Sequence, residues 1–204
     1  MQNTVVYLIR HSSPEHPMKA GRQAMYGPDA PLTADGKQKA QKLRSMIVSR
    51  EGKPFDVIYS SPFTRAFETA GILAGEALQN KIIVIEGLQD TASAWPGTPL
   101  EELSQIAEAG QLFTDPRTHE TIAEIAKRMT AAFHQIVAAH PGQLIGVVSH
   151  DDPLRILYDR ISHPEREITP YPQLVREFSL GQAQGLRLEI GPEGRVEIGP
   201  NQIG

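Results

Sequence analysis

Near its N-terminus the chain reads VVYLIRH (residues 5–11), five apolar residues followed at once by an arginine and a histidine. Two similar apolar runs occur at 82–85 (IIVI) and 144–148 (LIGVV), and a weaker one at 56–59 (DVIY). None of these runs alternates with polar residues. We therefore expect strands that are buried on both faces, as is typical of parallel sheets.

Helical stretches lie between the apolar runs. Thr33, with Asp35 close behind it, predicts the start of one helix, and Pro62 predicts the start of another. A third helix is expected from about residue 120 to 139, where apolar residues recur at helical spacing. Strands that alternate with helices predict an α/β fold, a three-layer sandwich with a mainly parallel central sheet and helices on both faces.

The C-terminal part has a different pattern. Three stretches, 173–180, 186–190 and 196–198, are separated by turns that contain glycine. We interpret them as antiparallel strands at the edge of the sheet. Because no internal repeat or linker interrupts the 204 residues, we interpret residues 1–204 as a single domain.

Composition excludes several classes of function. The chain has no cysteine, which excludes disulfides, thiolate metal sites and thiol nucleophiles. Its formal charge of −4 gives no attraction to nucleic acid or to anionic membranes. The apolar run at 5–9 is too short for a signal sequence or a membrane span, so we expect a cytoplasmic protein. No histidine spacing indicates zinc, and we expect neither a metal nor a cofactor.

Reactive residues follow the predicted strands at the points where the strands end. The first run leads into Arg10 and His11, the run at 144–148 leads to His150, and Arg65 stands shortly after the run at 56–59. In an open parallel sheet, ligands bind at the carboxyl ends of the strands, beside the N-termini of helices. We therefore expect these four side chains to meet in one crevice.

Two arginines and two histidines suit a tetrahedral anion. The guanidinium group is a planar fork that matches phosphate oxygens and stays charged at any relevant pH. Phosphoryl transfer chiefly needs positioning and electrostatic stabilisation of those oxygens. One histidine can be the nucleophile, since imidazole is often unprotonated near neutral pH, and a general acid must protonate the leaving alkoxide.

Four sequence blocks stand in order along residues 4–155. They are Leu8-Ile9-Arg10-His11, Pro31-Leu32-Thr33 with Gly36, Ser60-Ser61-Pro62-Phe63-Thr64-Arg65-Ala66 with Thr69-Ala70, and Val148-Ser149-His150. In this order and spacing the blocks resemble the histidine phosphatase (phosphoglycerate mutase-like) superfamily. The resemblance implies that His11 is transiently phosphorylated, that Arg10, Arg65 and His150 bind the phosphoryl group, and that no metal is required.

The loop after His11 departs from the family pattern. Ser12 stands where the family usually has glycine, and Ser13-Pro14 and Pro17 replace other common residues. The phosphate then loses one amide donor. The hydroxyl group of Ser12 or of Ser13 is the candidate replacement, and we predict Ser12 as a phosphate ligand.

The general acid is predicted at Asp90. In the branch of the family that this sequence resembles, the acid is usually a glutamate two residues after a leucine, and here Asp90 follows Leu88 at that spacing. A second branch takes its acid from an aspartate directly after the second histidine, which makes Asp151 a rival. Glu15, Glu86 and water are the remaining alternatives.

The sequence thus predicts a metal-independent phosphomonoester hydrolase that acts through a phosphohistidine on His11. The alternatives are a phosphoglycerate mutase and a phosphate-binding module with little turnover. We expect a small phosphorylated substrate as the partner, rather than nucleic acid or a membrane, and the sheet edge offers a surface for homo-oligomerisation. Residues 12–30 and 91–118 are the expected specificity loops. Glu120 is a lesser site candidate. Arg22 and Tyr26 are candidates for contact with the leaving group, although a position in a surface loop is favoured for both.

Overall fold

The computed structural model describes every residue except 1, 77, 79–81 and 92–94, and the last of these gaps lies within the predicted specificity loop 91–118. The strands are β1 (Thr4–Arg10), β2 (Met18–Lys19), β3 (Arg22–Gln23), β4 (Val57–Ser60), β5 (Ile82–Val84), β6 (Leu144–Ser149), β7 (Gly185–Ile190) and β8 (Val196–Ile203). The helices are α1 (Ala34–Glu51), α2 (Thr64–Ala74), α3 (Leu100–Glu108), α4 (Ile122–Ala139), α5 (Asp151–Ser162) and α6 (Tyr171–Glu177), with a short 3-10 turn, η2 (Glu86–Leu88).

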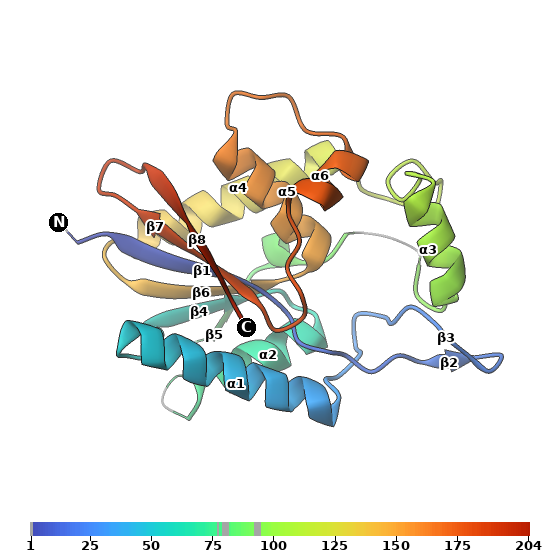
Figure 1. Cartoon of the computed structure of the whole chain (residues 1–204), viewed down its shortest axis with the longest axis horizontal. Coiled ribbons are helices and arrows are strands. Elements are labelled where there is room, and N and C mark those ends of the chain that lie inside the picture. The colour runs from blue at the N-terminus through green and yellow to red at the C-terminus, as the bar shows by residue number, and fades with distance from the viewer. Residues whose placement is uncertain (1, 77, 79–81, 92–94) are drawn as a thin grey trace.

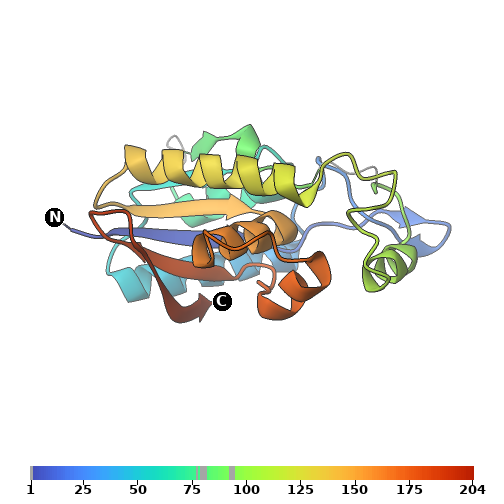
Figure 2. The ribbon, with the colours of Figure 1, turned by 90° about the horizontal axis from the view of Figure 1, so that it is seen from above.

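The central sheet confirms the predicted fold class. Its strands lie in the order β5-β4-β6-β1-β7-β8 (Figure 1). The first four are parallel to one another, whereas β7 pairs antiparallel with β1 and β8 pairs antiparallel with β7. Helices cover both faces, as the view from above also shows (Figure 2).

The two faces of β1 pack against different helices. Tyr7 and Ile9 belong to one core cluster with apolar residues of α1 and α2. Val6 and Leu8 belong to a second cluster, with apolar residues of α4 and α5. All four side chains are fully buried. This strand therefore has the two buried faces that its uninterrupted apolar run predicts.

The predicted strand at 173–180 is wrong, because most of this segment forms helix α6. Pro170 and Pro172 stand at the helix start, where a missing N–H is tolerated. Leu174 is buried within the helix, and Phe178, which directly follows it in an extended conformation, is buried as well.

The strand at 82–85 is also less buried than predicted. Strand β5 is at the edge of the sheet, and its Ile83 and Val84 side chains are 41% and 46% exposed. An apolar run without alternation therefore predicts a strand, but it does not tell a central strand from an edge strand.

Three strand ends lie side by side because their register is shared. Arg10 pairs with Ser149, and the amide of His11 donates to the Ser149 carbonyl at 3.0 Å. The amide of Ser61 donates to the Val148 carbonyl at 2.9 Å, which aligns the end of β4 with the end of β6. The sheet thus brings the residues that follow β1, β4 and β6 to one edge.

Helix α1 is locked to the loop that follows β1. Thr33 caps the helix by accepting a hydrogen bond from the Gly36 amide at 2.9 Å, as predicted. A Cβ atom on Gly36 would lie 2.3 Å from the Ser13 carbonyl oxygen, so only glycine allows this close approach. The loop after His11 is therefore held by the start of α1.

Two segments, residues 14–30 and 95–118, lie at one end of the molecule, and we call them together the cover (Figures 1 and 2). They are joined by backbone hydrogen bonds, from the Met25 amide to the Thr98 carbonyl and from the Gly97 amide to the Met25 carbonyl. The sequence did not predict helix α3 or the β2–β3 hairpin, which form parts of the cover. Within the described residues, no helix is both long and apolar enough to cross a membrane.

Candidate active site

The two predicted site histidines lie side by side. The ring centroids of His11 and His150 are 5.1 Å apart, and each side chain is 1% exposed. Arg65, in the first turn of α2, reaches His11 with its Nε atom at 3.2 Å. The structure therefore brings together residues that are up to 139 positions apart in the sequence.

The hydrogen bonds of His11 define its tautomer. Its Nδ1 atom is 2.7 Å from the Ser12 carbonyl, which can only accept, so Nδ1 carries the proton. The lone pair is then on Nε2, which accepts from Arg65 Nε. Burial, with His150 and Arg65 close by, holds the pKa of His11 well below its ordinary value. His11 is therefore a neutral imidazole, and its unprotonated Nε2 atom could act as a nucleophile once it is released from Arg65.

His150 is held by the end of the neighbouring strand. Its Nε2 atom is 2.8 Å from the Ser61 hydroxyl, which orients the ring. Its Nδ1 atom is buried, makes no hydrogen bond, and lies 3.3 Å from a carboxylate oxygen of Asp90. Burial, followed by the positive charge of Arg65, lowers the pKa of His150 well below its ordinary value.

Both arginines lie close enough to the two histidines to act on them electrostatically. The Nη2 atom of Arg65 donates to Asp90 at 2.7 Å, and its guanidinium group lies 4.6 Å from the ring centroid of Tyr26. Arg10 donates to the Leu180 carbonyl at 2.8 Å and pairs with Asp151 at 3.0 Å. The buried Nε atom of Arg10 has no hydrogen-bond partner. A phosphate oxygen is a suitable acceptor for such a donor.

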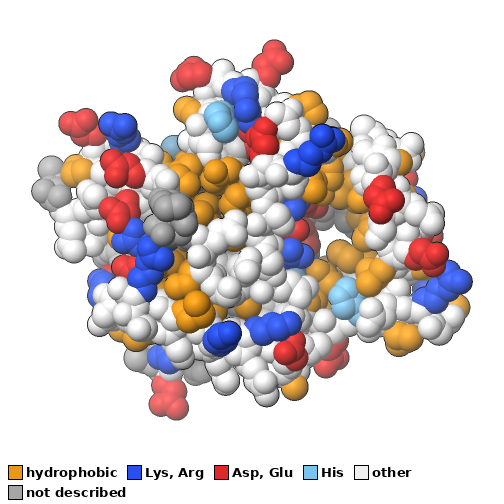
Figure 3. Space-filling model, viewed as in Figure 1, with side chains coloured by type: hydrophobic (Ala, Val, Ile, Leu, Met, Phe, Trp, Pro, Cys, Tyr) orange, Lys and Arg blue, Asp and Glu red, His pale blue; other side chains and the backbone are white. Residues whose placement is uncertain are grey.

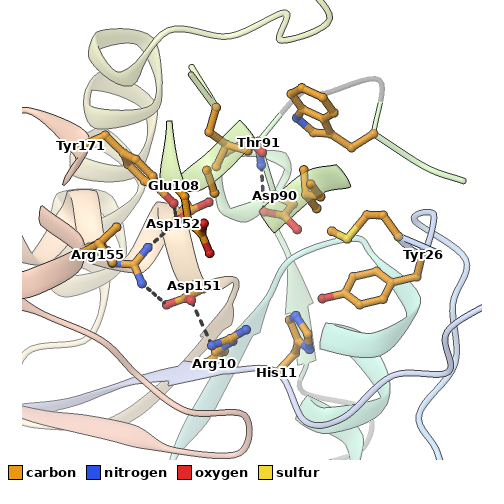
Figure 4. Close-up of a pocket in the computed structure, with 16 residues that line it drawn as sticks. Arg10, His11, Tyr26, Asp90, Thr91, Glu108, Asp151, Asp152, Arg155 and Tyr171 are labelled. Atoms are coloured by element: carbon orange, nitrogen blue, oxygen red, sulfur yellow. Dashed lines mark hydrogen bonds and ion pairs between the residues drawn. The ribbon is translucent and has the colours of Figure 1, made fainter. Parts of the chain in front are cut away.

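The two candidate acids differ in what they contact. Asp90 contacts Arg65 and His150 directly. Asp151 instead bridges Arg10 and Arg155, with both distances at 3.0 Å. Both aspartates line the same cavity (Figure 4). The other two predicted alternatives, Glu15 and Glu86, are exposed and do not belong to its described lining.

Asp90 is positioned by an arginine of α4 that the sequence did not point to. Arg128 donates to the backbone carbonyls of Gly87, Gln89 and Asp90 at 2.9–3.1 Å. Glu120 accepts from Arg128 Nη2 at 2.9 Å. The lesser candidate Glu120 therefore lies behind Asp90, where it contacts Arg128, and is not part of the described cavity wall.

The contacts of Ser12 do not support the predicted phosphate contact. This residue is fully buried, its amide donates to the Thr69 hydroxyl at 3.0 Å, and its own hydroxyl donates to the Gly36 carbonyl at 2.6 Å. The Ser13 hydroxyl donates to Gln182. Both serines thus use their hydroxyl protons within the protein.

Tyr26 lies at the site, so the favoured interpretation of this residue as part of a surface loop is wrong. Its ring is buried, stands edge-on to His11 at 6.2 Å, and rests against His16. Burial raises the pKa of Tyr26, so the phenol is neutral. Arg22, in contrast, is exposed and pairs with Glu101, as expected for a surface loop. A single tyrosine in a loop carries no pattern that separates it from its neighbours, so only the fold reveals it.

The site opens into a cavity of about 460 Å³ between the sheet edge and the cover. Figure 3 shows this side of the molecule hollowed between the body and the region of α3, with hydrophobic and charged side chains meeting there. In the close-up, Arg10 and His11 lie at one end of the cavity, with Glu108 and Asp152 at the other (Figure 4). The described residues contain no group of three or more potential metal-ligating side chains.

Known proteins share both the sequence pattern and the fold. The family model described as histidine phosphatase superfamily (branch 1) matches residues 6–180. Phosphoglycerate mutase-like protein 4 of Arabidopsis thaliana is 30% identical over 172 residues, which cover 80% of this chain and 73% of that protein. Phosphoserine phosphatase 1 of Hydrogenobacter thermophilus is 30% identical over 159 residues, with coverages of 74% and 72%.

A solved structure supports the same assignment. Bacillus stearothermophilus YhfR is 26% identical and superimposes with a TM-score of 0.76 over 96% of this chain and 95% of that one. The family model spans most of the sequence, and both relatives match more than two thirds of it. The chain belongs to the histidine phosphatase superfamily, branch 1.

Proposed function

We propose that this protein is a phosphomonoesterase in which His11 is the nucleophile and Asp90 the general acid. The observation that carries the proposal is the tautomer of His11, since the bond from Nδ1 to the Ser12 carbonyl leaves the Nε2 lone pair facing Arg65. A nucleophile needs an unprotonated nitrogen beside a group that holds the electrophile. Nε2 is unprotonated, and Arg65, which donates to it in the absence of substrate, can turn its donors to the phosphate. Membership of a family of histidine phosphatases supports the same chemistry.

In the first step, His11 Nε2 attacks phosphorus and the bond from phosphorus to the ester oxygen breaks. Arg10, Arg65 and His150 surround the transferring group and stabilise its equatorial oxygens. Asp90 gives its proton to the departing alkoxide, which leaves as an alcohol. The arriving phosphate competes with Asp90 for Arg65, and its negative charge favours a protonated carboxyl group next to it.

In the second step, water attacks the phosphohistidine. Asp90, now a carboxylate, takes a proton from that water, the bond from phosphorus to Nε2 breaks, and inorganic phosphate leaves. The side chain of Asp90 is 19% exposed, so water can reach the group that would activate it. This access favours hydrolysis over the mutase alternative, which must return the phosphoryl group before water arrives.

The test is a trapped intermediate. Wild-type protein and His11→Ala are mixed briefly with radiolabelled phosphomonoester and quenched in alkali, in which phosphohistidine survives. We expect label on the wild type at His11, release of inorganic phosphate, and neither in His11→Ala. Phosphate binding without label or release would favour the phosphate-binding module. Accumulation of 2-phosphoglycerate from 3-phosphoglycerate, instead of free phosphate, would favour the mutase.

A further inference from the structure

The part of the cavity beyond the phosphate site has a largely apolar wall. Its apolar members come from the cover and from α6. They are Met25, Trp95, Leu103, Ala107, Leu112 and Val175. A wall of this kind binds an organic body by removing apolar surface from water. The alcohol part of the substrate is what extends into this space.

The cavity offers no free positive charge to that alcohol. Among the described lining residues, the basic ones are Arg10, at the phosphate end, and Arg155. Arg155 donates from Nε to the Phe178 carbonyl at 2.9 Å, from Nη1 to Asp152, and from Nη2 to Asp151 at 3.0 Å. Its guanidinium group is therefore committed to protein acceptors on every nitrogen.

Negative charge gathers at the same place. The carboxylates of Asp151 and Asp152 share Arg155, and Tyr171 donates its hydroxyl to Asp152 at 2.7 Å. Glu108, at the last position of α3, lines the opposite wall. Figure 4 shows the side chains of Glu108 and Asp152 coming from different elements toward the same part of the cavity. Because Arg10 and Arg155 offset the charges of Asp151 and Asp152, the excess negative charge is that of Glu108, for which no ion pair is described. A second anionic group on the substrate would meet this carboxylate, while both arginines of the lining are already paired.

We propose that this phosphatase selects monoesters of apolar alcohols that carry no anionic group, and that it discriminates against esters such as 3-phosphoglycerate and phosphoserine, whose alcohols bear a carboxylate. The inference rests on the proposed function and names the substrate class of the same site. The apolar wall selects the organic body, while Glu108 and its neighbours reject a carboxylate.

The predicted discrimination against a carboxylate on the alcohol is tested with two substrates that differ by this one group, benzyl phosphate and 4-carboxybenzyl phosphate. Both release a primary benzylic alcohol, so the need for acid catalysis is closely similar. We expect kcat/KM to favour benzyl phosphate by at least about 10-fold. Glu108→Lys should reduce this ratio by about 5-fold or more, since it replaces a repelling charge with an attracting one. Glu101→Lys makes the same charge change on the same helix outside the described lining, and should leave the ratio within about 2-fold.

The apolar wall is tested with benzyl and ethyl phosphate. We expect benzyl phosphate to be preferred by about 10-fold in kcat/KM, and Leu103→Ala to lower that preference. Gln105→Ala, on an exposed position of the same helix, is the matched control and should leave it unchanged.

The outcomes separate the two proposals. Equal or faster turnover of 4-carboxybenzyl phosphate, or a ratio that Glu108→Lys does not move, would overturn the substrate class while leaving the phosphatase intact. If p-nitrophenyl phosphate and benzyl phosphate both resist hydrolysis and no phosphohistidine forms, the proposed function fails and the substrate class fails with it.

Discussion

The floor of the cavity and its cover are built in opposite ways. We call Arg10, His11, Arg65, Asp90 and His150 the floor. Its histidines follow buried parallel strands, and backbone bonds between those strands fix their positions. The cover is made of short elements, and the Arg22–Glu101 ion pair within it has side chains 69% and 67% exposed. Exposed pairs of this kind contribute little to stability.

This difference matches two different physical demands. A transferring phosphoryl group requires donors placed to within about half an ångström, which packed strands and helices provide. An apolar group of the substrate is bound in proportion to the apolar surface that it buries, and this interaction has no direction, so small shifts of the cavity wall are tolerated. The floor is therefore where small substitutions should have large effects on catalysis, and the cover is where they should change substrate preference.

The largest effect on catalysis is expected for Arg65, one of the two arginines of the floor. Arg65→Lys keeps the charge but loses the fork that reaches both His11 and Asp90. We expect kcat/KM for benzyl phosphate to fall by roughly 10²–10³-fold. Arg22→Lys, the same substitution in the cover, should change it by less than about 3-fold. Losses of similar size in the two variants would erase the distinction between floor and cover.

The next largest effect on the rate is expected for Asp90, the proposed acid, and its size depends on the leaving group. Asp90→Asn should slow benzyl phosphate by about 10²-fold or more, because its alkoxide needs a proton. It should slow p-nitrophenyl phosphate far less, since that phenolate leaves readily without one. Asp151→Asn instead loosens Arg10 and should slow both substrates by a similar factor. A leaving-group dependence that appears with Asp151→Asn and not with Asp90→Asn would move the acid to Asp151.

Much of the floor was predictable because strand ends and helix starts are recognisable from local sequence patterns. The apolar run that ends at Arg10-His11 indicates both a strand and the direction in which its end points. Tyr26 and Arg128 belong to no such pattern, since each acts through a contact made only by the folded chain. Helix α3 was missed for a related reason. Within residues 100–108, Ile106 is the only buried side chain, so the sequence shows a weak apolar stripe.

A tenfold effect on kcat/KM is expected from substitution of Arg128, which lies behind Asp90. Arg128 fixes the backbone on both sides of Asp90 but lies outside the described cavity wall. Arg128→Met should therefore lower kcat/KM for benzyl phosphate by about 10-fold, lower that for p-nitrophenyl phosphate less, and leave KM for both nearly constant. Lys127→Met, on the exposed side of the same helix, is the control. Equal losses on both esters would indicate a general structural defect and not a displaced acid.

The buried histidines make the floor sensitive to acid. The folded-state pKa of His11 lies below its unfolded value of about 6.5, so the unfolded chain binds more protons as the pH falls. The contribution of such a histidine to the free energy of unfolding is therefore fully present above about pH 6.5. Below that pH it declines by at most about 1.4 kcal/mol per pH unit for each buried histidine. Urea unfolding between pH 7 and pH 5 should show a shallower decline for His11→Asn than for wild type. His134→Asn, at an exposed position, should retain the wild-type slope.

The smallest catalytic effect is expected at Ser12, although this residue is next to His11, the proposed nucleophile. Its hydroxyl is committed to the buried Gly36 carbonyl, so Ser12→Ala removes a bond within the scaffold. We expect unfolding free energy to fall by about 1–2 kcal/mol, and kcat/KM and phosphate affinity to stay within about 3-fold of wild type. A rise in the phosphate Kd of 10-fold or more, with little loss of stability, would instead make Ser12 a ligand. The floor would then extend into the loop after His11, and closeness to the nucleophile would matter more than the direction in which each donor points.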